Sequence, residues 1–147
     1  MAAALGQPLK TPALDYTETE VEKEGFDVTV EAQDLCPRYI AHYVYDVKLG
    51  QSPAWMRRRL ALVGNNSISN IVDITNYIMR ELGQPLHAFD CDYLEGNAIQ
   101  VRRANEGEKI VTLDEKEFTL NPSNLVICDG KKPVALAGIM GGLNSEI

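Results

Sequence analysis

The chain has 147 residues, of which 45% are hydrophobic and 24% are charged, and its formal net charge is −7. This composition is ordinary for a soluble globular protein of one domain. No apolar run approaches the roughly 20 residues that a membrane span requires, and no leader of basic and then apolar residues opens the chain. We therefore expect a cytoplasmic protein with no membrane contact.

The negative charge is concentrated near the N-terminus. Residues 15–34 hold eight acids and one lysine, whereas the remaining chain holds thirteen acids and thirteen bases. This local excess does not exclude contact with a polyanion elsewhere, but the sequence shows no dedicated basic surface.

Three cysteines lie far apart in the sequence. No CxxC pair or Cys–His cluster accompanies them, so we expect reduced thiols and no metal site. They are Cys36, Cys91 and Cys128.

The first 25 residues are expected to connect the domain to an upstream segment. Residues 1–14 are small and apolar and contain two prolines, which favours extended chain. The alternation over residues 26–30 then predicts a strand. A longer strand is expected from Arg38 to Val47, and because both of its faces are partly apolar, it should lie centrally in a sheet.

Two helices are predicted next. Ser52 and Pro53 have the order of a cap followed by proline at the first helical position, and Gly64 should end the first helix. Its buried face is expected to contain Trp55, Met56, Leu60 and Val63.

The second helix is predicted over residues 71–82, where Ile71, Ile74, Ile78 and Leu82 recur at intervals of three and four. A second set of residues marks its ends. Either Ser69 or Asn70 can cap the start, Gly83 suits the left-handed position after the last turn, and Pro85 prevents continuation.

The chain after Asp90 is expected to be mainly strands. One short turn over residues 90–94 precedes them, and residues 114–116 and 129–132 are predicted hairpin connections. The strands are Ala98–Arg103, Lys109–Leu113, Glu117–Leu120, Leu125–Cys128 and Pro133–Ala137. We therefore predict an α+β fold, with a helical pair packed on a largely antiparallel sheet. Because no strand or helix follows the last glycines, the domain is expected to be incomplete at its C-terminus.

His87 is the first candidate for a functional residue, because it lies on a loop supported by a helix end. It either bonds a carbonyl group and braces the loop, or faces a pocket as a hydrogen-bonding group. Thr75 and Asn76 are unfavourable inside a helix. They form either a partly exposed turn or a binding site for a hydroxyl or ester oxygen.

The glycines at 138, 141 and 142 are the next candidate group. Such a density of glycine indicates either a tight turn with positive φ or a close approach of backbone to a ligand. The spacing is not that of a phosphate loop, and the chain shows no nucleophile elbow. The basic pairs at 102–103 and 131–132 are typical of surface charge, with contact to tRNA phosphate as the alternative.

Four strings of residues, in this order, resemble one protein family. They are CPRYIAHYV at 36–44, IVDITNYIM at 71–79, GQPLHAFD at 83–90 and ALAGIMGG at 135–142. Together they resemble the beta chain of bacterial phenylalanyl-tRNA synthetases, in its central editing domain. The resemblance covers most of the chain after about Phe26, so residues 26–147 are expected to be the N-terminal portion of that domain.

The resemblance implies a role in attaching phenylalanine to tRNA(Phe), and a share in the site that hydrolyses mischarged Tyr-tRNA(Phe). It implies that Thr75 and Asn76 approach the aminoacyl group and terminal adenosine, that Gly138 and Gly141 wall the amino-acid pocket, and that His87 lines it. The family's essential glutamate is expected downstream of this chain, so the catalytic residue is unknown and the isolated chain should be inactive.

For the parent enzyme the resemblance implies ATP and magnesium, an alpha subunit in an alpha2beta2 heterotetramer, and the 3′ end of tRNA(Phe) as partner; no cofactor is expected in this region. A synthetic pocket for phenylalanine rejects an analogue with one extra hydroxyl poorly, so a second site that bonds the phenol is needed. Two alternatives are a structural or interaction module without catalysis and a general RNA-binding module.

Overall fold

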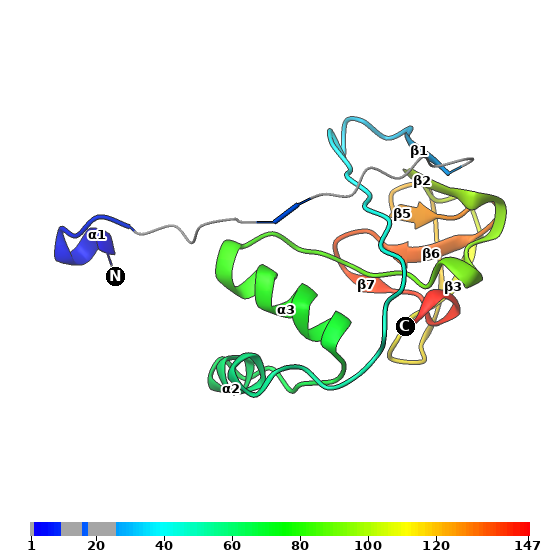
Figure 1. Ribbon diagram of the computed structural model, residues 1–147. Coiled ribbons are helices and arrows are strands. Elements are labelled where there is room, and N and C mark those ends of the chain that lie inside the picture. The colour runs from blue at the N-terminus through cyan, green and yellow to red at the C-terminus, as the bar shows by residue number, and fades with distance from the viewer. Residues whose placement is uncertain (1, 10–15, 18–25) are drawn as a thin grey trace.

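The computed structural model describes residues 2–9, 16–17 and 26–147. It has the predicted α+β fold, with a mainly antiparallel five-stranded sheet, a two-stranded sheet and two longer helices. In Figure 1 the helices lie beside the strands, and the extended chain after β1 crosses between the two regions.

The large sheet has the strand order β1-β2-β5-β6-β7. Its first pair, β1 (Asp27–Val30) and β2 (Ala98–Arg103), is parallel. The remaining neighbours are antiparallel, and they are β5 (Leu125–Cys128), β6 (Pro133–Leu136) and β7 (Met140–Gly141). The strands predicted in these regions therefore form: β2 and β5 have the predicted ranges, and the ends of β1 and β6 differ by one residue.

The second sheet is a hairpin of β3 (Lys109–Val111) and β4 (Glu117–Thr119), closed by the predicted turn at 114–116. An isolated bridge from Thr112 to Gly142 joins this hairpin to the end of β7. Two core clusters fill the strand region. One contains Ala104, Ile110, Leu120, Val126, Cys128 and Leu136, and the other contains Leu94, Ile99, Val101 and Val134.

The helices are α2 (Ala54–Leu62) and α3 (Asn70–Leu82). Both ends of α3 agree with the prediction. The Ser69 side chain accepts a hydrogen bond from the Val72 amide, and Gly83 adopts a left-handed conformation with φ of 74°.

The predicted cap of α2 is wrong. Pro53 occupies the cap position itself, and no side chain caps this helix. The Ser52 hydroxyl instead donates to the buried Asp73 carboxylate of α3, at 2.5 Å. A buried carboxylate requires hydrogen-bond donors more strongly than an exposed helix end does, so the serine joins the two helices.

The predicted central strand from Arg38 to Val47 is also wrong. The segment is extended but, among the described residues, no backbone ladder joins it to another strand. Its apolar side chains are largely exposed, including Ile40, Tyr43, Val44, Tyr45 and Val47. A strand pattern predicts local conformation, whereas a ladder requires a neighbouring strand that this fold does not supply.

The shorter elements complete the described chain. One helical turn, α1 (Ala2–Leu5), stands where extended chain was expected, consistent with the high helix propensity of alanine and leucine. Residues 10–15 and 18–25 of the expected connector lie outside the described residues. Three 3₁₀ turns, η1 (Cys91–Tyr93), η2 (Glu95–Asn97) and η3 (Leu143–Ser145), flank the sheet. None of the described helices has the length and apolar character needed to cross a membrane.

Candidate functional site

The structure brings His87 against Gly141. A Cβ built on Gly141 would lie 2.3 Å from Cε1 and 2.5 Å from Nε2 of the His87 ring, and 3.3 Å from Cδ1 of Leu113. No real side chain tolerates the two shorter distances, so the imidazole fits against β7 only because residue 141 is glycine. Two of the motifs singled out in the sequence thus meet in space.

The His87 ring is half enclosed by its neighbours. Phe89 packs edge-on against it, with ring centroids 4.7 Å apart and an interplanar angle of 71°. The partial burial of the ring lowers the pKa of His87 below its ordinary value of 6.5, since burial disfavours the charged form. The imidazole is therefore mostly neutral at pH 7, with one nitrogen that donates and one that accepts.

The loop-bracing role weighed for His87 finds no support in the hydrogen bonds. Across residues 26–147, neither ring nitrogen makes a hydrogen bond within the described structure. The ring nitrogens thus do not brace the loop, and the Nε2–Cε1 edge of the ring faces Gly141.

The glycines at the end of the chain have separate structural reasons. Gly138 lies in the β6–β7 turn with φ of +71°, and a Cβ there would meet nothing within 4 Å. A Cβ on Gly142 would lie 2.8 Å from the Val134 carbonyl oxygen and 2.7 Å from Oδ1 of Asn144. The tight-turn explanation therefore fits Gly138, whereas Gly141 and Gly142 are each approached closely by other parts of the protein.

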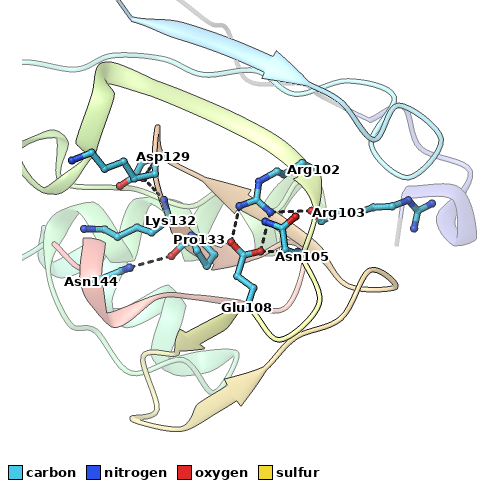
Figure 2. Close-up of polar contacts among 9 residues, drawn as sticks. Arg102, Arg103, Asn105, Glu108, Asp129, Lys132, Pro133 and Asn144 are labelled. Atoms are coloured by element: carbon cyan, nitrogen blue, oxygen red, sulfur yellow. Dashed lines mark hydrogen bonds and ion pairs between the residues drawn. The ribbon is translucent and has the colours of Figure 1, made fainter.

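Asn144 fixes the chain that follows these glycines. Its Nδ2 donates to the Pro133 carbonyl oxygen at 3.0 Å, a contact drawn in Figure 2. The ladder partner of Gly141 is Ala135 of β6, so the Asn144 contact adds to a pairing that already holds Gly141 beside β6.

Thr75 and Asn76 lie in the middle of α3 and are partly buried. The Thr75 hydroxyl donates to the Val72 carbonyl oxygen at 2.8 Å, one turn back in the same helix. Its oxygen still has lone pairs that can accept a hydrogen bond. The described contacts join neither residue to His87.

Sequence reasoning missed Asp129, which is 1% exposed and organises the β5–β6 turn. Its carboxylate accepts from the backbone amides of Lys131 and Lys132, at 2.7 and 2.8 Å, and from that of Glu95 at 3.1 Å. Asp-Gly in a predicted hairpin indicated a turn, but nothing in the sequence indicated the contact with Glu95.

The basic pairs at 102–103 and 131–132 contact acids within the molecule, and the two lysines share one carboxylate. Both lysine ammonium groups contact the Glu95 carboxylate, at 2.6 and 2.8 Å. Arg102 binds Glu108 through two hydrogen bonds, as Figure 2 shows. Arg103 contacts Asp34 at 2.5 Å. These cations are therefore already occupied, which weakens the alternative that they bind tRNA phosphate.

Comparison with known proteins places this geometry in context. Residues 35–147 match the family description "B3/4 domain". The chain is 56% identical to the phenylalanine–tRNA ligase beta subunit of Syntrophus aciditrophicus and 53% identical to that of Geobacter metallireducens. Its identity to the beta subunit of Bdellovibrio bacteriovorus is 49%. Each match covers 100% of this chain and 18% of the relative's length, and together they confirm the resemblance found in the four strings.

Proposed function

This chain belongs to the B3/4 domain family, and from that premise we propose that it forms part of the editing site of a bacterial phenylalanine–tRNA ligase beta subunit. In this proposal the site binds the 3′ end of tRNA(Phe) and hydrolyses a mischarged tyrosyl ester. Synthesis of Phe-tRNA(Phe) with ATP and magnesium, an alpha subunit as partner and a cytoplasmic location belong to the parent enzyme in the same proposal.

The contact between His87 and Gly141 is the observation that carries the proposal. It joins the loop after α3 to the end of β7 and leaves a neutral imidazole with both nitrogens unbonded among the described residues. Phe89 and Leu113 add apolar surface beside the ring. An apolar wall with one polar group suits an aromatic side chain that carries a hydroxyl.

Selectivity for tyrosine follows from hydrogen bonding. A His87 nitrogen bonded to the phenol would be left unpaired by phenylalanine, at a cost of about 1–3 kcal/mol. The editing site would thus leave the correct Phe-tRNA(Phe) unhydrolysed. A pocket of purely apolar groups does not distinguish tyrosine from phenylalanine strongly.

Hydrolysis of the ester requires an oriented water and polarisation of the carbonyl group. We assign Thr75 and Asn76 to contact with the aminoacyl ester and the terminal adenosine. Gly138 and Gly141 are the proposed walls of the amino-acid pocket. The general base is left unassigned.

The test is the substitution His87→Ala in the full-length ligase. Loss of one hydrogen bond should slow hydrolysis of Tyr-tRNA(Phe) by roughly 5- to 150-fold, narrow the preference for tyrosine over phenylalanine, and leave phenylalanine activation unchanged. His42→Ala is the matched control, because His42 is the other histidine and lies in the exposed segment. Unchanged deacylation by His87→Ala would show that His87 has no part in the editing site.

A further inference from the structure

The cations of this chain divide into two groups by position. In the described residues, each lysine and arginine from 102 onward has an acidic partner within salt-bridge distance. The cations between 38 and 80 have no such partner in the same part of the structure. They are Arg38, Lys48, Arg57, Arg58, Arg59 and Arg80.

Four of these unpaired cations belong to the helical pair. The acids within α2 and α3 are only Asp73 and Glu81, and Asp73 is fully buried. The exposed surface of the two helices is therefore positive, although the whole chain carries a net charge of −7. This surface can therefore attract an anion despite the negative charge of the whole chain.

An exposed tryptophan lies among these arginines. The Trp55 side chain is 52% exposed, and the Arg59 guanidinium lies over its ring, 5.5 Å from the centroid. Tyr77 of α3 packs edge-on against the same ring, also at 5.5 Å, and accepts a hydrogen bond from Arg59 at 2.5 Å. These contacts hold the indole and the guanidinium in fixed positions at the surface.

A shallow groove of about 530 Å³ runs along this face of α2. Its lining residues are Ala54, Trp55, Arg58, Arg59 and Leu62. Arginine binds phosphate through paired N–H groups, and an aromatic ring supplies a stacking surface for a base. A group of unpaired arginines beside an exposed indole suits a polyanion that also carries flat bases, as a nucleic acid does.

We propose that the Trp55–Arg58–Arg59 face of α2 binds the phosphate backbone of tRNA, with a base or ribose against the indole. The choice of tRNA as the RNA rests on the proposed function. The face would hold the tRNA body while the 3′ end reaches His87, so that binding and hydrolysis depend on different residues.

The first experiment measures binding of uncharged tRNA(Phe) to this chain by fluorescence anisotropy over a range of salt concentrations. In the double variant Arg58→Gln/Arg59→Gln, affinity for tRNA(Phe) should fall. The negative slope of log K against log salt should become shallower by about 1 for each lost phosphate contact. Lys109→Gln/Lys116→Gln is the control, because it removes the same charge from cations paired with acids. Equal effects of the two variants would overturn the proposal.

A second variant tests the aromatic contact. Trp55→Leu keeps an apolar side chain but removes stacking, and should weaken binding roughly 5- to 150-fold without changing the salt slope. Unchanged affinity for tRNA(Phe) in both face variants overturns the proposal. The His87→Ala variant should bind uncharged tRNA(Phe) as the wild type does. If His87→Ala does not slow deacylation, the proposed function fails, but the proposal of a tRNA-binding face on α2 is still tested by the binding experiments alone.

Discussion

At the scale of single residues, two glycines of the same motif have different functions. Gly138 provides a left-handed backbone conformation at a turn, whereas Gly141 leaves room for an imidazole. The sequence showed that several glycines were clustered and offered a tight turn or close approach to a ligand as the explanation. It gave no means of assigning one explanation to each glycine, because the neighbour of Gly141 comes from a distant loop.

Replacing Gly141 with alanine should displace the His87 ring into solvent, since the new Cβ would overlap Cε1. The pKa of His87, which partial burial lowers, should then rise toward its ordinary value. A titration followed by NMR of the histidine Cε1–H signals measures this, with His42 as the internal reference.

Gly138→Ala is the matched control. It strains the turn by roughly 1–2 kcal/mol because its φ is positive, but its Cβ meets no neighbour, so the His87 titration should not move. If both alanine variants raised the pKa of His87 equally, the steric explanation for Gly141 would be wrong.

At the scale of elements, α2 and α3 are joined through a buried carboxylate. Asp73 accepts hydrogen bonds from the hydroxyls of Ser52 and Ser67, both at 2.5 Å, and from the Ile68 amide at 2.9 Å. Burial by itself raises the pKa of Asp73, but these three bonds and the nearby Arg57 outweigh it, so the pKa lies below its usual range. The charged form is therefore the one that stabilises the helical pair.

Asp73→Asn should destabilise the chain by about 1–3 kcal/mol at pH 7, because the amide replaces an acceptor with a donor. A carboxyl whose pKa is lower in the folded state contributes its full stability above its unfolded pKa of about 3.9, and loses it as pH falls through the folded pKa. The difference in the free energy of unfolding between Asp73→Asn and the wild type should thus shrink toward pH 2.

Urea denaturation at pH 7, 4 and 2 provides the measurement. Asp92→Asn is the control, since Asp92 is exposed on η1 and should change stability little at any of these pH values. A constant difference for Asp73→Asn across the series would mean that the charge of the carboxylate contributes nothing.

The helices and most strands could be predicted because their determinants are local. The ends of α3 follow from Ser69 and Gly83, and β2 and β5 have the residue ranges expected from their apolar runs. Ser52 could not be assigned in this way. Its sequence neighbours favoured a helix cap, whereas its actual partner, Asp73, lies in another helix.

At the scale of the whole molecule, the strand region and the rest differ in packing. Both core clusters consist of residues from strands and their adjoining loops. By contrast, the extended segment 38–47 and the helical pair expose many of their large apolar side chains. The sequence correctly indicated the α+β fold class, and it indicated His87 and the glycines as candidate site residues. Apolar content alone did not predict which segments pack against another element.

This difference predicts a contrast in hydrogen exchange. Amides of β2, β5 and β6 are bonded in the sheet and should exchange slowly, since their exchange requires opening of the core. Amides of residues 38–42 and 44–47 join no strand ladder in the described structure and should exchange at close to the rates of an unstructured peptide. Mass spectrometry of peptic fragments at neutral pH resolves the two groups. Slow exchange across 38–47 in this chain would show a strand ladder there, as the apolar pattern on both faces first suggested, and would restore the central strand that the structure lacks.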